Sequence, residues 1–295
     1  MTADGKGRDA RILSASLAST TADFCWRRTA PNMTLPATLA VLPRQIRLTY
    51  FPIGGRVVAA RLAFALGGIP FQDRRVTYDE WTAMKGDRRA FPLGTIPTLE
   101  VDGRVFTQSL AINSFASRLA GLGSADPMDA LSVEQALLTM EEIYTGEHGF
   151  QSTMFIDDPA EKRKARERFL EENLRVHCRR LSDLLSPQGE GSGLRGVASG
   201  DTEGSGGAVP PTAGATVNSR APVAPPRPLP PIFWGSSLSA AELTWFGIYN
   251  HFSWGDVDHV PTDVLPAEFP RLRQVHAHVG GLEPVASFMK AHPWG

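Results

Sequence analysis

The side chains that could do chemistry in this chain are few and widely spaced. Gln108 and Ser109 precede an apolar segment with helical spacing, so they lie at the start of a predicted helix over 109–119. The free N–H groups and positive dipole end of a helix favour a carboxylate, although Ser109 also suits the role of an ordinary N-cap. His276 and His278, two apart on a predicted helix, face apart and make a poor metal pair. Since the seven histidines show no HExxH spacing, no metal is expected.

Charge and cysteine content exclude several classes of protein. The 295 residues carry 30 Lys and Arg against 31 Asp and Glu, a formal charge of −1, whereas nucleic-acid binders usually carry a basic excess. No apolar run approaches the roughly 18 residues of a membrane span. Cys25 and Cys178 are too few for a disulfide framework or a four-thiolate zinc site. We therefore expect a cytoplasmic protein in a reducing compartment, with neither nucleic acid nor membrane as a partner.

Hydrophobic patterning in residues 45–121 predicts the elements that position these groups. Gly67-Gly68 ends a helical segment, and Asp102-Gly103 is a strong hairpin signal. The predicted order is βαβαββα: strand 46–51, helix 55–66, strand 71–76, helix 79–85, strands 97–101 and 104–107, and helix 109–119.

The remaining ordered segments, 122–185 and 232–295, show helical patterns and little β character. Ser239 and Glu242 form a capping box before an apolar run, and residues 284–292 predict a final helix. One apolar stripe predicts a buried helix face: Leu170, Leu174, Cys178, Leu181 and Leu185. We expect an α/β domain over 45–121 followed by an all-α domain over 122–295.

Two segments lack the composition of a packed domain. Residues 186–231 hold 9 Gly and 9 Pro in 46 positions and no aromatic residue, which predicts a disordered insertion. Its proline-rich end, 225–231, suits an SH3-type partner, although a plain loop is the simpler interpretation. Residues 1–44 carry five arginines among Ser and Thr, as transit peptides do, but Asp4, Asp9 and Asp23 argue against that. We expect a disordered extension there, or a start at Met33.

Several separated motifs carry a resemblance to a known family. The chain resembles the soluble glutathione transferases of the sigma class, the prostaglandin D synthase-like group, over about 45–185 and 232–293. The motifs are RLTYF at 47–51 with GGR at 54–56, GTIPTLEVDGRVFTQSLAI at 94–112, SLSAAELTWFGI at 237–248 and FPRLRQVHAHVGGLEPVASFMKAHP at 269–293. The resemblance implies a thioredoxin-like α/β domain packed on an all-α domain, which is the glutathione transferase fold.

The resemblance also implies glutathione as co-substrate. Only the thiolate is a good nucleophile, and a hydrogen bond donated to sulfur favours it. Tyr50 matches the family's catalytic tyrosine, and Arg56 matches an arginine near the same sulfur. The alternatives are a tyrosine packed at a strand end and an ordinary cation at a helix start.

Further positions match residues of the family that hold the two substrates. Ile96-Pro97 corresponds to a cis-proline turn beside the cysteinyl backbone. Glu142, in the pair Glu141-Glu142, corresponds to an acidic residue that reaches glutathione across a dimer interface, with a solvated helix face as the alternative. The implied glutathione-binding set is Trp81, Lys85, Thr95, Ile96, Pro97, Gln108, Ser109 and Glu142, and the implied second-substrate pocket is Phe51, Ile53, Gly55, Thr244 and Ile248.

The implied function is detoxification by a homodimeric glutathione transferase. It would conjugate glutathione to a small electrophile or reduce a hydroperoxide. Thr244 and Ile248 do not repeat the aromatic and sulfur side chains of prostaglandin-isomerising members, which argues against that reaction. The alternative is a non-catalytic structural or ligand-carrying relative. Tyr50, Gln108 and Ser109 favour the enzyme, since a structural protein has no need of all three.

Overall fold

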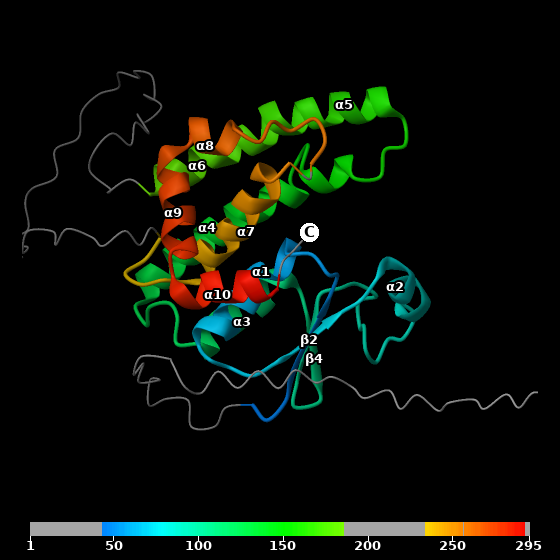
Figure 1. The fold of residues 1–295 in the computed structure, drawn as a ribbon, viewed down its shortest axis with the longest axis vertical. Coiled ribbons are helices and arrows are strands. Elements are labelled where there is room, and N and C mark those ends of the chain that lie inside the picture. The colour runs from blue at the N-terminus through cyan, green and yellow to red at the C-terminus, as the bar shows by residue number, and fades with distance from the viewer. Residues whose placement is uncertain (1–42, 186–233, 256, 293–295) are drawn as a thin grey trace, which may run out of the picture. The chain divides into compact units, whose positions relative to one another are not determined.

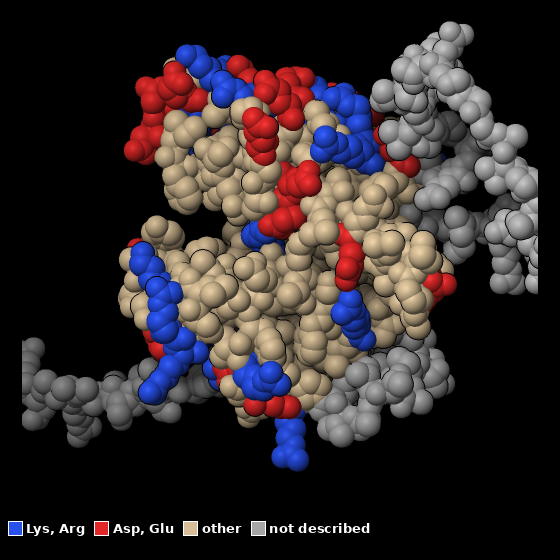
Figure 2. All heavy atoms as spheres, turned by 180° about the vertical axis from the view of Figure 1, so that it is seen from behind, with Lys and Arg blue, Asp and Glu red and all other residues tan. Residues whose placement is uncertain are grey.

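The computed structural model describes residues 43–185, 234–255 and 257–292 (Figure 1). The predictions for 186–231 and for nearly all of 1–44 lie outside the described residues. Among the described helices, none combines the length and apolarity needed to cross a bilayer. On the face seen in Figure 2 acidic and basic side chains are both present, and the surface is hollowed beside α2 (Tyr78–Met84).

The sheet has the mixed topology of a thioredoxin-like unit. Its order is β2-β1-β3-β4, with β1 parallel to β2 and antiparallel to β3, and β3 antiparallel to β4. The hairpin turns at Asp102-Gly103, as predicted. The strands are β1 (Ile46–Tyr50), β2 (Gln72–Arg75), β3 (Thr98–Val101) and β4 (Arg104–Thr107). The predicted βαβαββα order is therefore confirmed.

Three helices belong to this unit and fall where patterning placed them: α1 (Val58–Leu66), α2 (Tyr78–Met84) and α3 (Ser109–Leu119). The predicted helix over 55–66 is α-helical only from Val58, because a 3-10 turn, η1 (Gly55–Val57), comes first. Buried side chains of β1, β3, α1 and α3 form one core that continues onto the later helices through Leu243 and Phe246. The sheet and the helical region therefore meet without a solvent layer between α1 and the later helices.

The rest of the described chain is helical. Ser239 and Glu242 form the predicted capping box, and Cys178 lies fully buried in the predicted apolar stripe. A π-helical turn over 169–174, which patterning did not indicate, precedes α6. The elements are α4 (Pro127–Thr145), η2 (Phe150–Thr153), α5 (Pro159–Arg168), η3 (Phe169–Leu174), α6 (Arg175–Leu184), α7 (Ala240–Ser253), α8 (Val264–Glu268), α9 (Pro270–Gly280) and α10 (Glu283–Ala291).

Gly247 allows a close approach of α7 to α1. A Cβ at this position would lie 2.9 Å from Cβ of Val58, closer than side chains pack. The backbone of α7 therefore runs directly against the start of α1. This contact brings η1, which carries Arg56, next to the helical region.

Candidate active site

Tyr50 lies at the end of β1 with its phenol packed on Gly55. The side chain is 7% exposed. A Cβ added at Gly55 would lie 2.9 Å from Tyr50 Cε1 and 3.0 Å from its Oη. Gly55 also has φ +46, which residues with a Cβ rarely adopt. Glycine at 55 therefore lets the chain turn directly against the phenol.

The surroundings of Tyr50 keep its phenol protonated. Burial raises the pKa of Tyr50, while a hydrogen bond from the Arg56 backbone and the charges of Arg56 and Arg61 act in the opposite direction. Because burial dominates, the hydroxyl retains its proton at neutral pH. A protonated phenol can donate a hydrogen bond to a thiolate and so favour its charged form.

Arg56 connects η1 to α3 and α4. Its Nε donates to Oγ of Ser109 at 3.1 Å, and its Nη2 forms an ion pair with Glu141. Asn113 Nδ2 donates to the Arg56 carbonyl at 3.1 Å, and the guanidinium lies 5.1 Å from the ring centroid of Tyr144. The remaining Nη1 is buried and has no hydrogen-bond partner among the described residues. A buried donor without a partner costs free energy. The unpaired Nη1 therefore indicates that the pocket binds a polar or anionic ligand.

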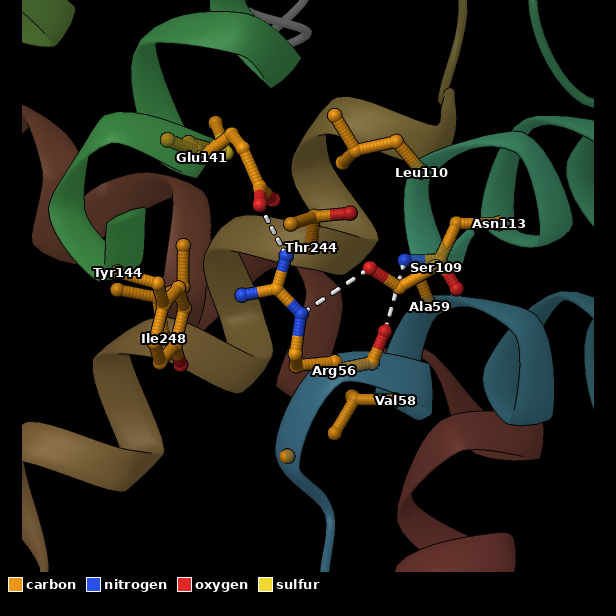
Figure 3. Close-up of a pocket in the computed structure, with 12 residues that line it drawn as sticks. Arg56, Val58, Ala59, Ser109, Leu110, Asn113, Glu141, Tyr144, Thr244 and Ile248 are labelled. Carbon is orange, nitrogen blue, oxygen red and sulfur yellow. Dashed lines mark hydrogen bonds and ion pairs between the residues drawn. The ribbon is translucent and has the colours of Figure 1, made fainter. Parts of the chain in front are cut away.

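A pocket surrounds Arg56 between η1, α3, α4 and α7. Figure 3 shows Tyr144 and Ile248 on one side of Arg56, and Ser109 and Asn113 on the other. Three predicted second-substrate residues line this pocket together with Arg56 and Ser109: Gly55, Thr244 and Ile248. The other two, Phe51 and Ile53, are not among its lining residues. Phe51 packs against the small core formed by Val76, Trp81 and Phe91, and its ring centroid lies 5.5 Å from that of Tyr50. Ile53 is 45% exposed.

Two predicted glutathione-binding segments show special backbone geometry. The Ile96-Pro97 peptide is cis, as predicted, and lies just before β3. Gln108 is exposed and has φ +73 immediately before α3, while Ser109 is buried. A non-glycine residue held at positive φ is strained, and such strain concentrates at ligand-binding sites. Thr95 lies exposed beside the cis peptide.

Trp81 and Lys85, which the resemblance assigns to glutathione binding, lie in different surroundings. Trp81 is 9% exposed and packs edge-on against Phe91, with ring centroids 4.9 Å apart. Lys85 caps the C-terminal end of α2 and is exposed. Trp81 therefore belongs to a small core that supports α2, and only Lys85 is free to reach a ligand in solvent.

The two adjacent glutamates, Glu141 and Glu142, have different partners. Glu141 meets Arg56 in the pocket, whereas Glu142 lies 3.5 Å from both His177 and Arg180 of the same chain. Sequence reasoning selected Glu142 and missed Glu141. Helical periodicity could have identified Glu141, since position 141 is three residues before Tyr144 and lies on the same helix face.

Arg61 is a second residue that sequence reasoning missed. It is fully buried in α1, donates to the carbonyls of Phe51 and Ile53, and forms an ion pair with Asp73. Burial lowers its pKa, and Asp73 acts in the opposite direction. Arg61 therefore fixes the segment that follows Tyr50. The available signal was a charged residue inside the apolar run VAARLAFAL.

No metal site accompanies this arrangement within the residues the structure describes, where no group of three or more His, Cys, Asp or Glu side chains is placed to hold an ion. The functional groups present are a phenol, a guanidinium, hydroxyls and a carboxylate. They can bind a polar ligand, stabilise a thiolate and donate hydrogen bonds.

Comparison with known proteins gives one family model, the glutathione S-transferase N-terminal domain, which matches residues 58–119. Glutathione S-transferase 1 of Ascaris suum is 41% identical over 90 residues, which cover 30% of this chain and 42% of that protein. Hematopoietic prostaglandin D synthase of Gallus gallus is 41% identical over 91 residues, 31% of this chain and 42% of that protein. In sequence, the chain thus spans less than half the length of these relatives.

Structural similarity extends further than sequence similarity. The solved structure of prostaglandin synthase D of Nilaparvata lugens superimposes with a TM-score of 0.62 at 18% identity, covering 85% of this chain and all of that one. At this identity the match establishes the shared fold. It includes the mixed sheet and the helical region that follows it.

Proposed function

We propose, since the chain carries a glutathione S-transferase N-terminal domain and has the glutathione transferase fold, that it is a sigma-like glutathione transferase. It would activate the thiol of glutathione for attack on small electrophiles or hydroperoxides. The observation that carries this proposal is the buried, protonated phenol of Tyr50 packed on Gly55 at the end of β1.

In the proposed mechanism Tyr50 donates a hydrogen bond to the sulfur of bound glutathione. The thiol loses its proton to solvent, and the thiolate attacks carbon, forming a C–S bond as the leaving group departs with its electron pair. With a hydroperoxide, the thiolate attacks the terminal oxygen, the O–O bond breaks, and the alkoxide leaves with the electron pair and takes a proton from solvent. A second glutathione then reduces the resulting sulfenic acid, which gives glutathione disulfide and water. The positive charge of Arg56 adds to the stabilisation of sulfur.

We assign the parts of glutathione to the segments around Tyr50. The γ-glutamyl carboxylate would meet Gln108 and Ser109 at the start of α3, where N–H groups and the helix dipole favour an anion. The cysteinyl backbone would pair with the chain at Ile96-Pro97. Lys85 would meet the glycyl carboxylate beside Thr95, with Trp81 supporting the helix beneath.

Tyr50→Phe tests the role of the phenol. It removes one donor and keeps the ring, so the loss of a charge-assisted hydrogen bond of about 1.5–3 kcal/mol lowers kcat/KM at least tenfold near neutral pH. The thiol of bound glutathione should titrate at higher pH. Tyr249→Phe, which removes a hydroxyl outside the pocket, is the control. Unchanged turnover and thiol titration in Tyr50→Phe would remove Tyr50 from the mechanism.

A glutathione-affinity column followed by a conjugation assay tests the proposed activity as a whole. Retention with conjugation supports the transferase. Retention without conjugation of any electrophile favours the alternative, a structural or ligand-carrying protein. Cytoplasmic detoxification belongs to the same proposal, and cell fractionation tests the location.

We also propose a symmetric homodimer. Exposed apolar side chains on α4, among them Met128, Leu131 and Leu138, leave a surface of the kind that partners cover. The exposed Glu142 lies on the same helix, where it would reach a neighbour's glutathione. Light scattering that shows a fully active monomer at micromolar concentration would contradict both the dimer and this role of Glu142.

A further inference from the structure

Asp73 of β2 holds two arginines with one carboxylate. Its Oδ1 accepts a hydrogen bond from Nε of Arg61 at 3.1 Å, and its Oδ2 accepts one from Nε of Arg75 at 2.9 Å. The Asp73 side chain is 16% exposed, whereas the Arg61 side chain is completely buried. A buried cation without a counter-charge costs much free energy. Asp73 therefore supplies the charge that stabilises Arg61 inside the protein.

The other two nitrogens of Arg61 hold the chain that follows Tyr50. Nη1 donates to the carbonyl of Ile53, and Nη2 donates to the carbonyl of Phe51 at 3.2 Å. Since both acceptors are backbone atoms, these bonds set the course of the chain. That course leads directly from Tyr50 to Gly55, on which the phenol packs. One buried cation therefore sets how the chain runs between the phenol and the glycine against it.

The backbone of Tyr50 itself is held in a different way, by the sheet. Tyr50 lies opposite Arg75 in the parallel ladder of β1 and β2, and the backbone N–H of Val76 donates to the Tyr50 carbonyl at 2.9 Å. A change of the Asp73 side chain leaves these backbone bonds in place and removes only the counter-charge of Arg61. The strand that carries Tyr50 and the segment after it can therefore be perturbed separately.

We propose that Asp73 is a positioning residue, which through Arg61 holds the segment after Tyr50 on the course that aims the phenol at the thiol of glutathione. This inference rests on the proposed glutathione transferase activity. Asp73 does not line the pocket around Arg56, so its effect on the reaction passes through Arg61 and the backbone. A remote change that misplaces a reacting group by about 1 Å can lower the rate about a hundredfold.

Asp73→Asn removes the charge and keeps the shape of the side chain. The amide oxygen can still accept one hydrogen bond from Arg61, but the buried guanidinium loses its counter-charge. We expect the guanidinium to move toward water and to release the carbonyls of Phe51 and Ile53. The kcat for conjugation should then fall about tenfold. The KM for glutathione should change less than about twofold, because the segments assigned to glutathione binding do not depend on Arg61.

A double-mutant cycle with Tyr50→Phe separates positioning from a general loosening of the domain. If Asp73 acts by placing the phenol hydroxyl, a chain that lacks this hydroxyl has little left to lose. In the Tyr50→Phe background, Asp73→Asn should therefore change kcat/KM by less than about twofold. A substitution that only loosened the domain would lower kcat/KM by the same factor in both backgrounds.

Glu100→Gln is the matched control. Glu100 of β3 forms an ion pair with Arg47 of β1 at 2.9 Å, and its side chain is 32% exposed. This variant also removes a carboxylate that pairs with an arginine of the sheet region, but near the start of β1, whereas Tyr50 ends that strand. Its kcat/KM should stay within about twofold of the parent. Thermal melts of the full chain and of every variant set an assay temperature at which all are folded.

The outcomes separate this inference from the proposed function. Full activity of folded Asp73→Asn, or equal losses in both backgrounds, would overturn the role of Asp73 and leave the transferase intact. A parent chain that conjugates no electrophile would refute both proposals.

Arg61→Lys takes the place of Asp73→Asn in the cycle if the asparagine variant does not fold. Lysine keeps the charge beside Asp73 but lacks the planar fork that reaches both carbonyls. A loss of kcat/KM that disappears in the Tyr50→Phe background would support the inference. No loss, or an equal loss in both backgrounds, would overturn it.

Discussion

Substituting Gly55 tests whether the backbone at η1 positions the Tyr50 phenol, to which we assign the catalytic role. Alanine at 55 introduces two separate perturbations. It places a side chain at φ +46, and it puts a Cβ 2.9 Å from Cε1 and 3.0 Å from Oη of Tyr50. Ordinary contacts begin near 3.4 Å, so the phenol must move by about 0.5 Å or η1 must shift.

The two perturbations have different magnitudes and readouts. A left-handed backbone conformation costs a residue with a Cβ about 1–2 kcal/mol. For a chain of this size, that lowers Tm by about 2–8 °C. Displacing a hydrogen-bond donor by a fraction of an ångström removes much of an interaction worth about 1.5–3 kcal/mol. We therefore expect kcat/KM of Gly55→Ala to fall about tenfold or more in a conjugation assay.

Gly68→Ala is the matched control. Gly68 has φ +60, and nothing lies within 4 Å of a Cβ built there. This variant carries the same kind of backbone strain without a collision with Tyr50, so it should lose a similar Tm and retain full activity. If Gly55→Ala were as active as Gly68→Ala at a temperature where both are folded, the close packing of Tyr50 on Gly55 would not position the phenol, and the reasoning would be wrong.

Three further predictions concern stability and are read in thermal melts. Arg61→Leu removes a fully buried guanidinium and leaves the carbonyls of Phe51 and Ile53 without their donor, which should cost about 1–3 kcal/mol even though Asp73 still pairs with Arg75. A Tm within 2 °C of the parent would contradict the supporting role of Arg61. Ser239→Ala removes the cap of α7 and should cost about 1 kcal/mol, whereas the exposed Ser132→Ala should have little effect. Burial lowers the pKa of His276 to about 4, below its unfolded value of 6.5. The unfolded chain therefore binds the proton first, and stability falls as pH decreases from about 6.5 to about 4. His276→Phe should show a shallower fall over that interval, and an identical pH profile would refute this contribution.

Local signals were enough to locate most elements. Helix 109–119 was predicted with the observed bounds, because Gln108 and Ser109 mark its start and Gly121 follows its end. The hairpin at Asp102-Gly103 was equally local. The start of α1 was not predicted correctly from local signals, because the conformation of Gly55 depends on the Tyr50 ring that packs against it. The π-helical turn before α6 likewise follows from packing, which periodicity does not record.

Sequence motifs identified several residues that the structure brings together in one pocket, but they did not identify residues that tertiary contacts select among neighbours. Thr244 and Ile248 line the pocket with Arg56 and Ser109 although they are far apart in sequence. The sequence does not show which of the two adjacent glutamates, Glu141 or Glu142, faces the pocket. The rotation of α4 about its axis places Glu141 there. The charged Arg61 stands out within an apolar run, but the sequence does not show which groups it binds. Its acceptors are backbone carbonyls that lie eight and ten residues earlier.

The proposed roles of the pocket residues, in binding glutathione or the electrophile, correspond to the elements on which these residues lie. The family model spans 58–119 and so includes Ile96-Pro97 and Ser109, which would contact glutathione, the substrate shared by every reaction of such an enzyme. Tyr144 and Thr244 lie outside that span, on α4 and α7, and line the pocket on its helical side, where the proposed function places the electrophile. Since a thiolate needs the same donors whatever it attacks, selectivity between electrophiles has to come from the second wall. In this chain that wall presents the buried, unpaired hydroxyl of Thr244 beside apolar Ile248, so under the proposed function an electrophile that carries a polar atom should react preferentially.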